Sequence, residues 1–342
     1  MARRKKDINI KLIAKEANAS VATVSRVINN RTDVSEALRK RVRAVIDRYE
    51  FTPTKSVERR MNFGIIATVD PSGIDEYLSQ TLNGVTRYSS ENKLETTVIL
   101  DYVRFESRSL LQIIRERRCD AVVIISPERV FDEIKDLEKA EVPTMLVNSE
   151  YQAHTIGFIN NRSYDGAWNA TNYLLQSGHE KIGFLCGGLL NSINHQERLQ
   201  GYKDAMEKAG KAISPNWIIP HQPTQQTPEA GYREAQTLLS NCPEITAIFA
   251  TNDEMAFGAI KYCWDHNLNV PNDISIIGFD DIPFSSYMHP ALTTVRQPLN
   301  ELGYRAIKYL DLYLKEKIKE LPCENLNTEL VIRQSVTVHN KS

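Results

Sequence analysis

The chain has 342 residues, of which 42% are hydrophobic and 25% charged, and its formal net charge is −1. This length allows two or three domains with full cores, and the ordinary composition excludes a disordered or fibrous chain. No apolar run approaches the roughly 20 residues of a membrane helix, and the basic N-terminus lacks the apolar stretch of a secretory signal. We therefore expect a cytoplasmic protein without membrane contacts.

The spacing of reactive side chains argues against an enzyme. The five cysteines include no Cys-x-x-Cys pair, and the seven histidines lack the spacing of metal ligands. The nucleophile elbow Gly-x-Ser-x-Gly, the P-loop and the zinc motif His-Glu-x-x-His do not occur in the sequence. We expect reduced thiols, no disulfide framework, no metal, no cofactor and no catalytic residues.

Residues 9–35 have the pattern of two short helices joined by a tight turn. The first helix is predicted from an apolar stripe at helical spacing, formed by Ile10, Ile13, Ala14 and Ala17. Ser20 is a typical N-cap for the second helix, because its hydroxyl can accept a hydrogen bond from a backbone N–H, and Ser35 is the predicted cap of a third helix. The pattern indicates a helix-turn-helix, although an ordinary helical hairpin with solvated charges fits it as well.

The outward face of the second helix carries groups that suit a DNA major groove, whereas Val24, Val27 and Ile28 should face inward. Small apolar side chains can contact thymine methyls, hydroxyl and amide groups can bond phosphates or base edges, and a guanidinium fork suits guanine. The predicted DNA-contacting residues of this helix are Ser20, Val21, Ala22, Thr23, Ser25, Arg26 and Asn29.

Charge distribution favours DNA binding over a plain hairpin. Residues 1–60 carry sixteen Lys and Arg against seven Asp and Glu, a balance of +9, which leaves −10 for residues 61–342. A basic head on an acidic body is what contact with DNA phosphates requires.

The stretch Ser20–Asn29, followed by Val34-Ser35 and a basic helix, closely resembles the lactose-repressor (LacI/GalR) family of bacterial transcription regulators. Five later segments occur in the family order, namely Arg198–Tyr202, Thr251–Gly258, Ile276–Pro283, Leu292–Pro298 and Thr328–Ser335. The resemblance implies an all-α helix-turn-helix domain over residues 1–50, a hinge over 51–62, and an effector-binding and dimerisation domain over 63–342. That last domain should be an α/β fold with two lobes of the periplasmic-binding-protein type, built on Rossmann-like parallel sheets.

The hinge departs from the family pattern. In the family this connector forms a short helix on the operator, and a leucine at its end wedges into the minor groove. The aligned position here is Arg60, preceded by Arg59 and followed by Met61. An arginine enters a narrow minor groove electrostatically, whereas an apolar wedge unstacks a base step and kinks the duplex. Either Arg60 contacts the groove, or Met61 supplies the wedge after a one-residue shift.

From Phe63 onward, short apolar runs alternate with helical patterns, which predicts βαβ units and parallel sheets. The predicted strands are Phe63–Val69, Thr97–Leu100, Ala121–Ile125, Thr144–Val147, Ile182–Cys186, Ala247–Ala250 and Ile274–Gly278. The predicted amphipathic helices are Glu76–Glu91, Gln196–Ala209, Pro228–Leu239 and Met255–His266. The resemblance implies three chain crossings between the lobes, near residues 160–163, 290–296 and 322–328. The three tryptophans lie in apolar contexts, which indicates core positions.

Polar residues that directly follow strands are the predicted effector ligands, because ligands of open parallel sheets bind at the carboxyl ends of strands. Such a residue can equally be a turn or helix cap. Strand position selects Thr68, Asp70, Asn148, Ser149, Asn252, Asp253, Asp280 and Asp281. The resemblance places Asn148, Asn194, Arg198, Asn252, Asp280 and Gln297 at effector contacts, with Tyr77 roughly at an aromatic position of the family site. Guanidinium, carboxylate and amide groups together suit a polyhydroxylated or heterocyclic ligand. A solvated salt bridge is the alternative for Arg198.

The sequence therefore predicts a transcription regulator, most simply a repressor, that binds a pseudo-palindromic double-stranded operator as a homodimer and responds to a small effector, with a sugar as the leading choice. Two alternatives stay open. The effector could be replaced by a protein corepressor, as in some family members. The least favoured alternative is an enzyme with a DNA-binding head.

Overall fold

The computed structural model describes residues 9–28, 34–49, 51, 61–68, 76–101, 108–127, 130–187, 192–219 and 227–339. These residues form two compact units, which divide between Arg60 and Met61. The first unit contains the headpiece helices, and the second contains two α/β lobes.

The headpiece consists of α1 (Ile10–Glu16), α2 (Val21–Ile28) and α3 (Glu36–Arg48). Its core contains the apolar stripes of all three helices, with Ile13, Ala14, Ala17, Val24, Val27 and Val42 buried. Ser20 caps α2 as predicted, since its hydroxyl accepts from the Thr23 N–H at 3.0 Å. The prediction for Ser35 is only half right, because Ser35 stands at the N-cap position of α3 but its side chain makes no cap hydrogen bond there.

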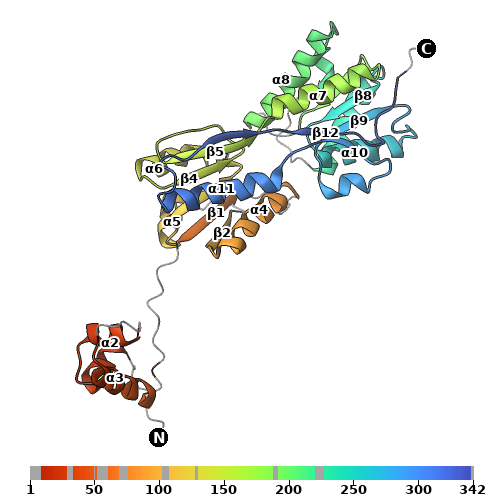
Figure 1. Cartoon of the computed structure of the whole chain (residues 1–342). Helices are drawn as coiled ribbons and strands as arrows, with labels where there is room; N and C mark the ends of the chain where they lie inside the picture. The colour runs from red at the N-terminus through yellow and green to blue at the C-terminus, as the bar shows by residue number, and fades with distance from the viewer. Residues whose placement is uncertain are drawn as a thin grey trace. The chain divides into compact units, whose positions relative to one another are not determined.

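The first lobe is a parallel sheet with helices on both faces (Figure 1). Its strands are β1 (Asn62–Thr68), β2 (Glu95–Asp101), β3 (Ala121–Ile125), β4 (Thr144–Val147), β5 (Ile156–Asn161) and β11 (Cys323–Leu326), in the order β11-β5-β4-β3-β1-β2. Its helices are α4 (Glu76–Asn92), α5 (Leu110–Glu116), α6 (Phe131–Lys139) and α11 (Leu299–Leu314). Successive residues of β1 serve opposite faces, so Ile65 packs with the α4 and α11 core and Ile66 with the α5 and α6 core.

The second lobe repeats this architecture. Its strands are β6 (Ile182–Leu185), β7 (Ile218–Ile219), β8 (Ala247–Ala250), β9 (Ser275–Asp280), β10 (Thr293–Arg296) and β12 (Glu329–Val331), in the order β12-β10-β9-β8-β6-β7. Only β12 is antiparallel to its neighbour. The remaining elements are α7 (Ser163–Gln176), α8 (Ile193–Lys208), α9 (Pro228–Asn241), α10 (Asp253–Asp265) and the short 3₁₀ turns η2 (Pro215–Trp217) and η3 (Pro283–Ser286).

The chain passes between the lobes at three neighbouring places. These are Arg162 between β5 and α7, residues 297–298 between β10 and α11, and residues 327–328 between β11 and β12. The first and third crossings are hydrogen-bonded, because the Arg162 N–H donates to the Leu326 carbonyl at 2.8 Å. The second crossing comes slightly later than the expected 290–296, since residues 293–296 pair with β9 as strand β10.

Sequence periodicity missed five strands, each of which carries polar residues or lies at a sheet edge. β5, β7, β10, β11 and β12 have no counterpart among the predicted strands. The expected core position of Trp264 is wrong, because this side chain is 77% exposed. A helix placed at the lobe surface can carry an apolar side chain outward, and the local pattern does not reveal that.

Candidate functional site

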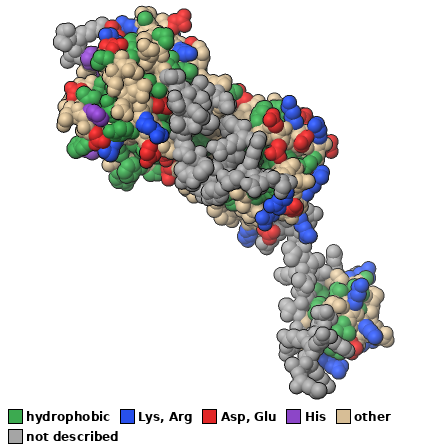
Figure 2. Space-filling model, turned by 180° about the vertical axis from the view of Figure 1, so that it is seen from behind, with side chains coloured by type: hydrophobic (Ala, Val, Ile, Leu, Met, Phe, Trp, Pro, Cys, Tyr) green, Lys and Arg blue, Asp and Glu red, His purple; other side chains and the backbone are tan. Residues whose placement is uncertain are grey.

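The predicted DNA-reading face of α2 is exposed in the headpiece. Val21, Ala22 and Arg26 are exposed and Ser25 and Thr23 are half-buried, while Val24 and Val27 point into the core. Figure 2 shows Lys and Arg side chains over the described face of this unit, with little acidic surface among them. An exposed helix with a small apolar N-terminal end and basic surroundings has the form that a major groove admits.

Arg41 fixes the turn between α1 and α2, a role that the sequence analysis did not assign. Its Nε donates to the Ala17 carbonyl at 2.8 Å and its terminal nitrogen to the Asn18 carbonyl at 3.2 Å. Asn18 has a φ of 46°, a conformation that asparagine tolerates better than most residues. Arg41 thereby sets the angle at which α2 leaves α1.

Three predicted DNA contacts, Asn29, Arg59 and Arg60, lie outside the described residues. Met61 is half-buried and packs against the core under α4 and α11, within the second unit. The choice between Arg60 and Met61 as the minor-groove contact therefore stays a prediction.

Arg198 lies where the second sheet reverses its strand order. It projects from α8, and its guanidinium donates to the carbonyl of Thr251, directly after β8, at 2.6 Å. The hydroxyl of Thr251 in turn donates to the carbonyl of Cys186, directly after β6, at 3.1 Å. β6 and β8 are the neighbours between which the order reverses, and ligands of open sheets bind at the carboxyl ends of strands at this point.

Arg198 is buried with part of its hydrogen-bonding capacity unused. Its guanidinium carbon lies 3.8 Å from the centre of the Phe279 ring, and its Nε has no hydrogen-bond partner within the described part of the chain. Burial lowers the pKa of Arg198, and the nearby Asp280 carboxylate opposes that shift. The alternative of a solvated salt bridge is wrong, because Arg198 is only 3% exposed.

Asn194 stands one helical turn before Arg198 on the same face of α8. It is 1% exposed, and neither its amide nitrogen nor its oxygen has a hydrogen-bond partner among the described residues. Buried side-chain amides are almost always hydrogen-bonded, so an unpaired one is a candidate ligand contact.

A chain of buried hydrogen bonds connects the two lobes beside Arg198. Asn161, at the end of β5, donates to Gln297 at 2.6 Å and to Asn148 at 3.3 Å. Gln297 in turn donates to the carboxylate of Asp280 at the end of β9. Asn161 and Gln297 thus bring together the predicted residues Asn148 of the first lobe and Asp280 of the second. Asn161 itself was not predicted, because it ends a strand that the sequence pattern did not indicate.

The other predicted effector residues have different positions. Asn252 is the N-cap of α10, since its oxygen accepts from the Met255 N–H at 2.8 Å, which is the alternative that its place after a strand allowed. Tyr77, on α4 of the first lobe, is close enough to Arg198 to raise the pKa of that guanidinium. Thr68 is the last residue of β1, and neither its side chain nor Asp70 is among the described parts.

Glu234 is a buried acid near the candidate site, and the sequence did not reveal it. It lies on α9 beside the end of β6, where it accepts from the Gly187 N–H at 3.4 Å while its other oxygen has no partner in the described ranges. Burial raises the pKa of its carboxyl to about 7. A helix residue that faces the end of a distant strand carries no local sequence signal.

The fold and the site together define a helix-turn-helix protein with a two-lobed, periplasmic-binding-protein-like receptor. Residues 9–54 match the profile "Bacterial regulatory proteins, lacI family", and residues 171–336 match the "Periplasmic binding protein-like domain". The chain is 30% identical over 335 residues to catabolite control protein A of Priestia megaterium, covering 96% of this chain and 99% of that protein. It is 31% identical over 334 residues to the transcriptional repressor PurR of Photobacterium profundum, with 96% and 98% covered.

Solved structures show the same architecture. A lac repressor dimer bound to operator and the anti-inducer ONPF superposes with a TM-score of 0.76 at 22% identity, covering 97% of this chain and 100% of that one. A LacI-family regulator from Enterococcus faecium with bound ribose gives 0.71 at 26% identity, covering 81% and 100%. The chain belongs to the LacI family of bacterial transcription regulators, and several of its relatives, PurR among them, are named as transcriptional repressors. Among the residues that the structure describes, no helix is long and apolar enough to span a membrane.

Proposed function

We propose that the protein is an effector-controlled transcription repressor whose small-molecule ligand, a sugar or related polyhydroxylated metabolite, binds at the carboxyl ends of β6, β8 and β9. The observation that carries this proposal is the pair Asn194 and Arg198, which are buried on one face of α8 with unused hydrogen-bonding atoms. A ligand rich in hydroxyls would use donors and acceptors of this kind together with the Asp280 carboxylate. The ribose-bound regulator from Enterococcus faecium supports the sugar class.

A thermal-shift screen of the full-length chain tests the ligand proposal. The panel should contain D-ribose, cellobiose and further mono- and disaccharides, each at millimolar concentration. A specific ligand raises the melting temperature, and above Kd the shift grows with the logarithm of the ligand concentration, because the ligand binds only the folded state. No shift with any sugar, at any concentration of the series, would contradict the sugar class and favour a protein corepressor.

We further propose that two copies bind a pseudo-palindromic operator, one α2 in each half-site. The lac repressor dimer on its operator supports this arrangement. An operator can be selected from random DNA by the full-length protein, and analytical ultracentrifugation should then find two chains on each operator. One chain per operator would contradict the dimer.

Replacing Arg26 by Ala should weaken binding to the selected operator by about 1–3 kcal/mol, because an exposed guanidinium on the reading face contributes base discrimination of that size. Fluorescence anisotropy at fixed salt measures the change. Lys40→Ala, an exposed cation on α3, is the control and should reduce only the salt dependence of binding. Equal losses for specific and random DNA in the Arg26 variant would place Arg26 on phosphates instead.

A further inference from the structure

The turn after β9 carries an unusual backbone conformation directly beside the proposed effector site. Asp280 has a φ of 132° and Asp281 a φ of 57°, and residues with side chains rarely adopt such values. Two consecutive residues of this kind persist only where the surrounding structure holds them in place. The contacts that hold this turn therefore also determine where the Asp280 carboxylate points.

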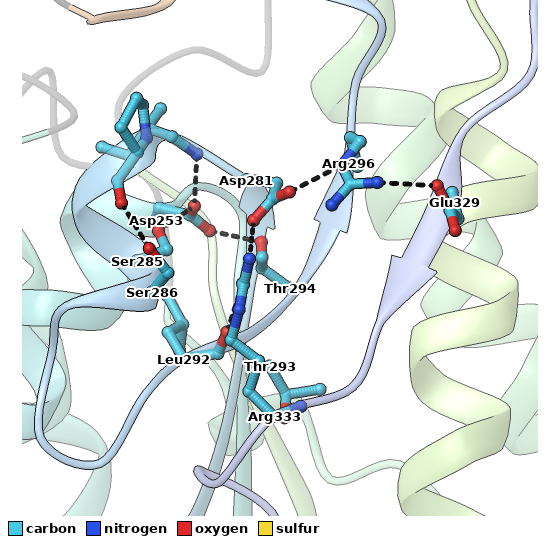
Figure 3. Close-up of polar contacts among 12 residues, drawn as sticks. Asp253, Asp281, Ser285, Ser286, Leu292, Thr293, Thr294, Arg296, Glu329 and Arg333 are labelled. Atoms are coloured by element: carbon cyan, nitrogen blue, oxygen red, sulfur yellow. Dashed lines mark hydrogen bonds and ion pairs between the residues drawn. The ribbon is translucent and has the colours of Figure 1, made fainter.

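Two arginines from different segments clamp the carboxylate of Asp281 (Figure 3). Arg296, the last residue of β10, donates its Nε at 2.7 Å, and Arg333, just after β12, donates a terminal nitrogen at 2.6 Å. The Asp281 side chain is 7% exposed and that of Arg333 18%, so water and salt screen their ion pair little. Each arginine is anchored in turn, Arg296 to Glu329 at 3.0 Å and Arg333 to the Leu292 carbonyl at 2.8 Å.

The chain on either side of Asp281 is fixed as well. Asp253 is fully buried, and its carboxylate accepts from the Ile282 N–H at 3.0 Å and from the hydroxyl of Thr294 (Figure 3). On the other side, Asp280 accepts from Gln297, the residue that follows Arg296. Arg296 and Gln297 thus hold two consecutive acids of the turn, with the side chain of Asp280 engaged in the site and that of Asp281 engaged by the clamp.

We propose that Asp281 is a positioning residue for effector binding, whose ion pairs with Arg296 and Arg333 hold the turn that presents the Asp280 carboxylate to the effector. The proposal rests on the proposed function in taking Asp280 as an effector contact. The two ion pairs of Asp281 concern only the conformation of this turn, so their effect on it can be tested without any ligand.

The first test uses the ligand-free, full-length protein with Arg333→Met, which keeps most of the side-chain volume but removes the donors. We expect backbone amides in peptides covering residues 279–286 to exchange hydrogen at least fivefold faster, and a crystal structure to show Asp280 separated from Gln297. Arg296→Met is the milder second variant, because that side chain is 48% exposed. Arg108→Met, which breaks an exposed ion pair with Glu116 in the first lobe, is the matched control and should leave these peptides unchanged.

The second test separates positioning from general destabilisation. The probe is D-ribose or cellobiose, whichever stabilises the wild-type protein. In isothermal titration, Arg333→Met should raise the Kd for the sugar at least tenfold. Its affinity for the operator in the absence of sugar should be unchanged. Asp281→Gly should raise the Kd for the sugar similarly, because glycine accepts a positive φ without strain but lacks the carboxylate. Asp281→Asn tolerates this conformation and retains an acceptor, so its Kd should lie between those of wild type and Asp281→Gly.

The outcomes are distinguishable. Unchanged exchange and an intact Asp280–Gln297 contact in both arginine variants would overturn the clamp, as would wild-type sugar affinity in Asp281→Gly. If no sugar of the thermal-shift panel stabilises the wild-type protein, the sugar assignment fails, and the exchange and crystallographic results alone decide the clamp.

Discussion

Arg198→Met is expected to abolish the response of operator binding to the effector while leaving operator binding without effector close to wild type. The guanidinium is buried, stacks on Phe279 and keeps an unused donor at the end of the second sheet. Removing one partner of a buried, charge-assisted contact typically costs about 2–5 kcal/mol of binding, which corresponds to a loss of thirtyfold or more. Met retains much of the packing against Phe279, so the fold should survive.

Isothermal titration with the stabilising sugar, followed by anisotropy of the selected operator with and without that sugar, measures both quantities. Arg233→Met, an exposed arginine on α9, is the matched control in the same lobe and should behave as wild type. A Kd within threefold of wild type for Arg198→Met would remove Arg198 from the effector contacts and leave it as a support for the Thr251 carbonyl.

Acidification from pH 6.5 to pH 4 is expected to remove the contribution that neutral His179 makes to the stability of the second lobe. This side chain is 2% exposed, and its ring nitrogens contact Thr246 at 3.0 Å and the Thr337 carbonyl at 3.1 Å. Burial lowers the pKa of His179 from 6.5 to about 4, against a weaker opposing effect of the Thr337 hydrogen bond. The unfolded chain takes up the proton first as pH falls, so the stability that the neutral ring contributes above pH 6.5 is lost, by about 3 kcal/mol, between pH 6.5 and pH 4.

Urea unfolding followed by tryptophan fluorescence suits this measurement, because Trp168, Trp217 and Trp264 all lie in the second lobe. His179→Gln can keep both hydrogen bonds without titrating, so the difference in unfolding free energy between wild type and this variant should change by about 3 kcal/mol across this window, because groups common to both proteins cancel. His154→Gln, an exposed residue of the first lobe, should leave the slope unaltered. The same slope in wild type and His179→Gln would assign the acid sensitivity to other groups.

The sequence by itself determined the elements whose signals are local. Residues 121–125 and 144–147 appear as strands with the predicted bounds, because a parallel strand buried on both faces is a continuous apolar run. Val24 and Val27 point inward and Arg26 outward because helical period fixes the faces of α2 once its N-cap is known. The two lobes were predicted from the resemblance to the LacI/GalR family, whose characteristic segments can also be recognised in the sequence.

Only the tertiary structure decided which polar residues meet. Asn161 and Gln297 lie 136 positions apart and Asp281 and Arg333 lie 52 apart, so neither contact exists until the sheets have their register and the crossings are side by side. Asn194 likewise became a candidate only in the folded lobe, because it is burial that leaves its amide without a partner among the described residues. Sequence pattern records the secondary structure and the face of each residue, whereas burial, hydrogen-bond satisfaction and backbone strain are properties of the assembled lobes, because they depend on neighbours that are remote along the chain.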